Sequence, residues 1–86
     1  MKKAIRFSAA WCQPCKQYEK HWNAVSGNRE DWTFEVIDVD TDPENSSKYG
    51  IRSIPTTIFE NNGELLDRKS GVLTEAELHK MLDQLQ

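Results

Sequence analysis

Hydrophobic positions in the first third of the chain recur with the periods of a strand and then of a helix. Ile5 and Phe7 lie on one face of an alternating run at residues 3–8, which predicts a strand. An apolar stripe at steps of three and four residues then predicts an amphipathic helix, which we expect to end near residues 26–28 at Gly27. The members of this stripe are Cys15, Tyr18, Trp22 and Val25.

The middle of the chain predicts a second strand and a short helix. Residues 32–40 are rich in β-branched and aromatic side chains, and the adjacent apolar pair Val36 and Ile37 predicts burial on both faces of the strand. Asp42 is a suitable cap for a helix with Pro43 in its first turn, running to about Tyr49. A strand, a helix and a strand in succession indicate a βαβ unit with parallel strands.

The last third predicts a hairpin followed by a helix. Strands at 54–60 and 64–70 flank the turn sequence Asn-Asn-Gly at 61–63. A final helix is expected to begin at Thr74, where Glu77 completes a capping box. Its buried face is expected to hold Leu78, Met81 or Leu82, and Leu85. The prediction is an α/β fold of the order βα-βα-ββα, with a four-stranded mixed sheet flanked by helices.

Composition narrows the class of protein. The 86 residues are enough for a single domain, 1–86, and 37% hydrophobic residues with a net charge of -3 are typical of a globular protein. Basic residues are scattered, so no nucleic-acid partner is expected. The N-terminal stretch lacks the apolar run of a secretory signal, and no membrane association is expected; we predict a cytoplasmic protein.

The only two cysteines, Cys12 and Cys15, lie within the stretch Ser-Ala-Ala-Trp-Cys-Gln-Pro-Cys-Lys at 8–16. They could hold a metal, serve as small buried apolar residues, or exchange electrons with a disulfide. Zinc needs four ligands, and only His21 and His79 remain as nitrogen donors, both expected to be exposed helix residues. A mononuclear metal site is therefore not expected, although a cluster shared between subunits stays open. A C-x-x-C pair within a βαβ pattern favours redox chemistry.

The position of Cys12 suits a nucleophile. It falls where the first strand ends and the helix begins, so unpaired backbone N–H groups and the helix dipole lower its thiol pKa from about 8.5 toward roughly 7 or below. Cys15 lies one turn further on, on the buried stripe, and Pro14 between them fits a first helical turn. A loop this short constrains the unfolded chain little, which favours a disulfide that opens and closes.

The segment Trp-Cys-Gln-Pro-Cys-Lys at 11–16 resembles the Trp-Cys-Gly-Pro-Cys-Lys active site of the thioredoxin family. Three further segments resemble that family in register: Gly-Ile-Arg-Ser-Ile-Pro-Thr at 50–56, Asn-Gly-Glu at 62–64 and Ser-Gly-Val-Leu-Thr-Glu-Ala-Glu-Leu at 70–78. The resemblance implies a thioredoxin-like fold in a minimal form close in size to glutaredoxins, because the family's usual first strand and helix have no counterpart. It also implies that Cys12 attacks a substrate disulfide and that Cys15 resolves the mixed disulfide.

The resemblance further implies a substrate surface. Pro55 is expected to be the family's cis-proline beside the sulfurs, and the backbone of Ile54 would be offered to an incoming peptide. Trp11, Ile54 and Gly71 would frame an apolar docking surface; the alternative is that they are ordinary partly exposed residues. Gln13 and Lys16 are candidate tuning or supporting residues within the motif.

Two positions depart from the family pattern. A buried acid usually lies six residues before the first cysteine, where this chain has Arg6, and the basic residue that it faces is replaced by Val36. Either the Arg6 stem packs on the sheet with its guanidinium in water, or Arg6 lies near Cys15 and stabilises thiolates. A separate acidic run could influence the site, but a solvated strand end with a helix cap is favoured; it comprises Asp38, Asp40, Asp42 and Glu44.

The resulting functional prediction is a protein-disulfide oxidoreductase that cycles Cys12 and Cys15, with no bound cofactor and no metal. By resemblance, its partners are disulfide-containing proteins and a thioredoxin-reductase-like flavoprotein that uses NADPH, and the protein is expected to be a monomer. One alternative is a glutaredoxin-like enzyme that draws on glutathione, although the motif is not of the Cys-Pro-Tyr-Cys type. The other is a binding module that keeps the surface without using the thiols.

Overall fold

The computed structural model describes residues 1–86 and contains the seven elements in the expected order. The strands are β1 (Lys2–Ser8), β2 (Thr33–Asp38), β3 (Thr56–Asn61) and β4 (Glu64–Ser70). The helices are α1 (Gln13–Ser26), α2 (Pro43–Lys48) and α3 (Glu75–Gln84). The predicted βα-βα-ββα order is therefore confirmed.

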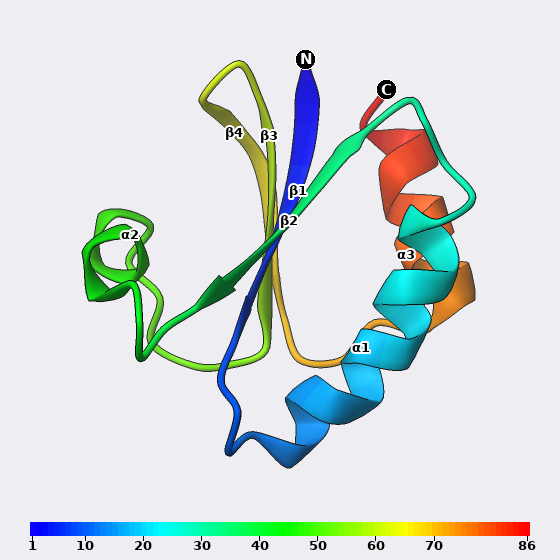
Figure 1. Ribbon diagram of the computed structural model, residues 1–86. Coiled ribbons are helices and arrows are strands. Elements are labelled where there is room, and N and C mark those ends of the chain that lie inside the picture. Colours follow the sequence, from blue (N-terminus) through cyan, green and yellow to red (C-terminus); the bar gives the residue numbers. More distant parts are fainter.

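The four strands form one mixed sheet in the order β2-β1-β3-β4. β1 pairs in parallel with β2, and β3 pairs antiparallel with both β1 and β4. The β3–β4 hairpin turns through Asn62 and Gly63, both with positive φ, which suits the predicted Asn-Asn-Gly turn. Helices α1 and α3 cover one face of the sheet and α2 covers the other (Figure 1).

Successive side chains of β1 point to opposite faces of the sheet, and a hydrophobic core lies on each face. Ile5 and Phe7 face α2 and pack with Ile58, which confirms that they share a face. Ala4 faces the other way and belongs to the larger core between the sheet and α1 and α3. The large side chains of that core are Tyr18, Trp22, Val25, Trp32, Phe59, Leu73, Leu78 and Leu82. The predicted α1 stripe is thus buried in full.

One expectation about burial is wrong, and another is confirmed except for Leu85, which is only partly buried. Val36 is 52% exposed because β2 is an edge strand of the sheet, so β2 is not buried on both faces as its apolar pair suggested. On α3, Leu78 and Leu82 are buried while Met81 and Leu85 only pack at the margin of the core. None of the helices combines the length and the apolar character that crossing a membrane would require.

Several loops lie together at one end of the sheet, where the strands begin or finish. The chain leaves β1 and enters α1 at the same end of the sheet where β3 begins and β4 finishes (Figure 1). A backbone hydrogen bond of 2.9 Å from Gly71 N–H to the carbonyl of Pro55 joins the two loops at the β3 and β4 ends. Residues from three separate parts of the sequence therefore meet beside the cysteines.

Candidate active site

The cysteines are joined by a disulfide at the start of α1, with a Cα–Cα distance of 5.2 Å. Cys12 is the N-cap of the helix, and its Sγ accepts a hydrogen bond from the backbone N–H of Cys15 at 3.2 Å. Pro14 occupies the first turn, where its missing N–H costs no hydrogen bond. The local sequence thus fixes both sulfurs at the end of a helix.

The helix terminus gives the site its electrostatic character. The first turn of α1 holds no acidic residue, so nothing there offsets the positive end of the helix dipole. In the reduced protein, the N–H group that now contacts the Cys12 sulfur would favour a thiolate at the same place. Cys12 is 4% exposed and Cys15 1%, so both cysteines are buried in the oxidised protein.

Trp11 stands beside the disulfide as a large exposed side chain, 68% accessible. Its indole Nε1–H donates to the carboxylate of Asp40 at 2.8 Å, a contact between residues 29 positions apart. Asp40 in turn follows Asp38, whose carboxylate accepts from the Asp40 backbone N–H at 2.8 Å. Asp40 is exposed and Asp42 caps α2, as expected of a solvated strand end with a helix cap, and Asp40 in addition contacts Trp11 beside the disulfide.

The loop before β3 brings Ile54 and Pro55 to the same end of the sheet as the cysteines. The Ile54–Pro55 peptide bond is cis, Pro55 is buried, and Ile54 packs against the small cluster formed by Ala9, Cys12 and Cys15. The backbone N–H and C=O of Ile54 take no part in the hydrogen bonds of the fold. A backbone bend with free hydrogen-bonding groups therefore lies next to the disulfide.

A shallow groove of about 220 Å³ lies between Trp11 and Ile54. Val39 and Ile51 supply apolar walls and Arg52 adds a positive charge. Gly71 does not line this groove, although it contacts Pro55 and adopts a φ of +90°, which a side chain would disfavour. Trp11, Ile54 and Gly71, which are predicted to frame one docking surface, thus lie at the same end of the sheet. Only Trp11 and Ile54 line a common groove.

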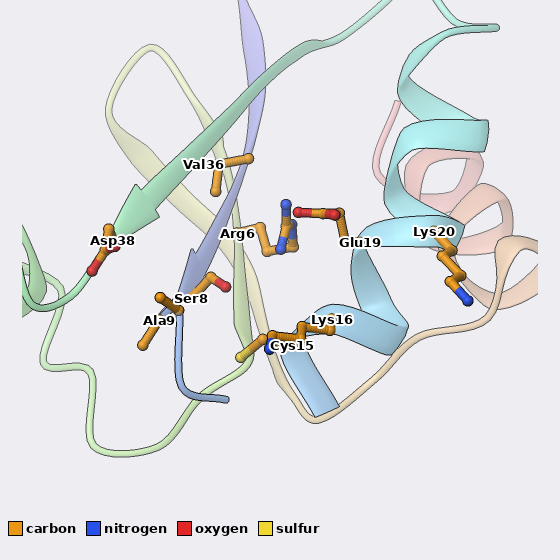
Figure 2. Close-up of a pocket in the computed structure, with 10 residues that line it drawn as sticks. Arg6, Ser8, Ala9, Cys15, Lys16, Glu19, Lys20, Val36 and Asp38 are labelled. Carbon is orange, nitrogen blue, oxygen red and sulfur yellow. The ribbon is translucent and has the colours of Figure 1, made fainter. Parts of the chain in front are cut away.

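Arg6 is 3% exposed, so its stem packs on the sheet as one of the two interpretations expects, but its Nε is enclosed and only a small part of the guanidinium borders the open pocket beside α1. The guanidinium carbon lies 5.6 Å from the ring centroid of Trp22 and 5.9 Å from that of Tyr18. Arg6 pairs with Val36 across β1 and β2, as the resemblance to the family implies. Its side chain occupies the α1 side of the sheet and points toward Glu19 (Figure 2).

A second pocket, of about 520 Å³, lies on this side of the disulfide. Figure 2 shows Arg6 reaching from β1 toward α1, with Glu19 beside it and Cys15 at the same pocket. The other charged residues at the rim are Lys16, Lys20 and Asp38. Burial raises the pKa of neighbouring Tyr18 to about 12, so its hydroxyl stays neutral and hydrogen-bonds to Thr57 Oγ1 at 2.6 Å.

The remaining candidate residues lie at the periphery. Gln13 and Lys16 are exposed on the first turns of α1. His21 and His79 are half-buried, not exposed as expected, and His79 Nδ1 lies 3.2 Å from Arg29. No group of three or more His, Cys, Asp or Glu side chains has an arrangement that could hold a metal ion.

Comparison with known proteins identifies the family. The thioredoxin family model matches residues 2–84. A thioredoxin of Mycoplasmoides gallisepticum is 42% identical over 81 residues, covering 94% of this chain and 81% of that protein. Thioredoxin C-3 of Corynebacterium nephridii is 37% identical over 76 residues, covering 88% of this chain and 52% of that protein, so the chain spans about half of some longer relatives.

Among solved structures, Fasciola hepatica thioredoxin superposes with a TM-score of 0.91 at 28% identity, covering 99% of this chain and 81% of that chain. The likeness thus covers the whole fold and includes the stretch that holds the Cys12–Cys15 disulfide. Together with the family match over residues 2–84, this shows that the chain belongs to the thioredoxin family of thiol–disulfide oxidoreductases.

Proposed function

We propose that this protein reduces disulfides of other proteins, with Cys12 as the attacking thiol and Cys15 as the resolving thiol. The observation that carries the proposal is the Cys12–Cys15 pair at the N-terminus of α1, with the cap sulfur receiving a backbone N–H. A sulfur in that position is stabilised as a thiolate, which is the nucleophile in thiol–disulfide exchange. The place of Cys15 inside the first turn of α1, on the buried face of the helix, supports its role in the second, intramolecular step.

The proposed reaction conserves sulfur bonds and electrons. The Cys12 thiolate attacks one sulfur of the substrate disulfide, forming a mixed disulfide and releasing the other substrate sulfur as a thiolate. Cys15 then attacks Cys12 Sγ, the mixed disulfide breaks, and the second substrate sulfur leaves. Both substrate thiolates take up protons from water, and the two electrons they gained come from the protein dithiol, which ends as the disulfide.

Ile54 and Trp11 support a mode of substrate binding. The unpaired N–H and C=O of Ile54 are suited to hydrogen-bond an extended peptide that carries the target cysteine. The groove between Trp11 and Ile54 would take an apolar side chain of that peptide. Substrates are therefore proteins with a disulfide in an exposed, extended segment.

Electrons must return to the disulfide after each cycle. We propose an NADPH-dependent flavoprotein reductase as their source, a monomer as the working form and the cytoplasm as the compartment, whose thiol poise suits repeated reduction. Glutathione is the alternative source. Turnover with glutathione and without a reductase of the thioredoxin-reductase type would assign the protein to the glutaredoxin-like class instead.

Insulin reduction with dithiothreitol as electron donor tests the proposal. We expect the protein to accelerate precipitation of the insulin chains and the Cys12→Ser variant to lose this activity entirely. The Cys15→Ser variant, reduced beforehand and mixed with insulin after removal of the dithiothreitol, is expected to accumulate a mixed disulfide, visible on a non-reducing gel, because the resolving thiol is gone.

The non-catalytic binding module makes the opposite prediction. A variant with both Cys12→Ser and Cys15→Ser would then retain the biological activity of the protein, and the native protein would not accelerate insulin reduction. A circular dichroism spectrum matching the unaltered protein serves as the control that each variant is folded.

A further inference from the structure

Arg6 is a buried cation without a hydrogen-bonded counter-ion. It lies in the middle of β1, and its Nε has no hydrogen-bond partner. No carboxylate lies within salt-bridge distance of it; the faces of Trp22 and Tyr18 and the neighbouring Glu19 carboxylate compensate its charge in part. Removing a guanidinium from water is costly, and buried charges in proteins are usually paired. In the oxidised protein Arg6 therefore lacks a close anionic partner, and an anion that forms in another state of the protein could serve as one.

The thiolate of Cys15 is such an anion, because Cys15 borders the same pocket as Arg6. Arg6 and Cys15 border the same pocket of about 520 Å³, and Figure 2 shows both between β1 and the first turns of α1. A thiolate at Cys15 exists only after the disulfide opens, so its charge is transient. The reduced protein would thus contain the anion that the oxidised protein lacks.

The other charges facing the pocket act more weakly. Lys16, Lys20 and Glu19 are exposed, and Asp38 is half-buried at the end of β2, so water screens them more than it screens Arg6. Burial lowers the pKa of Arg6, while Glu19 acts in the opposite direction. A guanidinium nevertheless keeps its proton at neutral pH.

We propose that Arg6 is a positioning residue for thiol–disulfide exchange: its buried charge stabilises the thiolate of Cys15 and shifts the Cys12–Cys15 couple toward the dithiol. The inference rests on the proposed function. A nearby positive charge favours the ionised form of a thiol, and stabilising the reduced state makes a couple more oxidising. Arg6 would therefore make this protein a weaker reductant than it would be with a neutral residue there.

The step that Arg6 assists is the resolution of the mixed disulfide. The Cys15 thiolate supplies the electron pair that forms the bond to Cys12 Sγ, and the bond between Cys12 and the substrate sulfur breaks. The substrate sulfur leaves with that bond's electron pair and is protonated by water. Arg6 is not consumed and exchanges no proton; it raises the fraction of Cys15 present as thiolate.

Replacing Arg6 with methionine tests the inference, because methionine keeps an unbranched stem against Trp22 and removes the charge. We expect Arg6→Met to shift the equilibrium with glutathione at least about tenfold toward the disulfide, equivalent to about 30 mV. The pKa of Cys15, measured by thiolate absorbance in a Cys12→Ser background, is expected to rise in the same variant. In Arg6→Lys, which keeps a positive charge, the equilibrium with glutathione and the pKa of Cys15 should both stay close to those of the unaltered protein.

Two surface variants complete the experiment. Glu19→Gln removes the carboxylate that opposes Arg6 and is expected to shift the equilibrium at least about twofold toward the dithiol. Lys20→Met removes an exposed cation at the same pocket and is the matched control, with an expected change of less than about twofold.

An unchanged equilibrium and Cys15 pKa in folded Arg6→Met would overturn the inference. Should that variant not fold, a Glu19→Gln equilibrium that stays unchanged or moves toward the disulfide would overturn it equally. These results leave the proposed function intact, since it fails only if the unaltered dithiol does not reduce insulin and Cys15→Ser traps no mixed disulfide.

Discussion

At the residue scale, one hydrogen bond orients the most exposed aromatic side chain of the protein. Trp11 presents its ring to solvent beside the disulfide while its indole N–H contacts the Asp40 carboxylate. A hydrogen bond to a charged acceptor is stronger than one between neutral groups. Asp40 therefore holds the ring in one orientation beside the disulfide.

Loss of this contact is expected to weaken substrate reduction. Asp40→Ala frees the indole, so kcat/KM for insulin should fall roughly 3- to 10-fold, the equivalent of about 0.5–1.5 kcal/mol for one hydrogen bond. Asp40→Asn, which keeps an acceptor oxygen, should fall less. Glu44→Ala alters an exposed acid of the same run and is expected to leave the kinetics unchanged. Equal kinetics for Asp40→Ala and the native protein would show that the ring orientation is irrelevant.

At the element scale, helix ends determine where the site and the core lie. The cap of α1 is itself the catalytic candidate Cys12, whereas α3 begins with a conventional capping box. In that box Glu77 N–H donates to Thr74 Oγ1 at 3.2 Å, and Thr74 N–H donates to Glu77 Oε1 at 3.0 Å. The hydrogen bond that the Thr74 backbone N–H donates to the carboxylate is the main reason that the pKa of Glu77 is lowered.

Removing the cap of α3 is expected to destabilise the protein without changing its chemistry. Thr74→Ala should lower the free energy of unfolding by about 1 kcal/mol, because a helix N–H loses its acceptor. Urea titration followed by circular dichroism measures this change. Lys80→Ala, an exposed position on the same helix, is the matched control, and an equal loss in both variants would contradict a specific role of the cap.

At the scale of the whole molecule, an ionic cluster joins the loop after α1 to the C-terminal helix. Arg29 contacts Asp31 at 2.7 Å and Asp83 at 2.8 Å, and the Gln86 side chain donates to Asp31 at 2.6 Å. The hydrogen bond from Arg29 is the main reason that the pKa of Asp31 falls from 3.8 to about 2. Segments more than fifty residues apart in the sequence are linked in this way.

The cluster predicts a pH-dependent contribution to stability. Because the folded pKa of Asp31 lies below its ordinary value of 3.8, the contribution is complete above about pH 5 and is lost as pH falls toward about 2. Arg29→Ala should lower Tm by about 2–6 °C at neutral pH, and this difference should shrink steadily in acid. Arg52→Ala, an exposed arginine without an ion pair, is the control. A Tm difference that stays constant down to pH 2 would contradict the assignment.

The fold was largely predictable from the sequence because its signals are local. The capping residues Asp42 and Thr74 bond to backbone groups three positions away, and the Asn-Asn-Gly turn joins neighbouring strands. The cysteine pair was predictable for the same reason. Cys12 is the cap of α1 and Cys15 lies one turn later, so the start of this one helix sets the positions of both. Interactions over three or four residues do not depend on where distant segments pack.

Tertiary structure alone decided the environment of the site. Val36 appeared buried from its apolar neighbours, yet β2 lies at the sheet edge, and strand order follows from the pairing of distant segments. Asp40 meets Trp11, and Arg6 is enclosed under Trp22 and Tyr18, through contacts that no local pattern encodes. The sequence by itself therefore determined which residues could react. The packing of sheet against helix decided which charges surround them, because burial and proximity exist only once distant parts of the chain have come together.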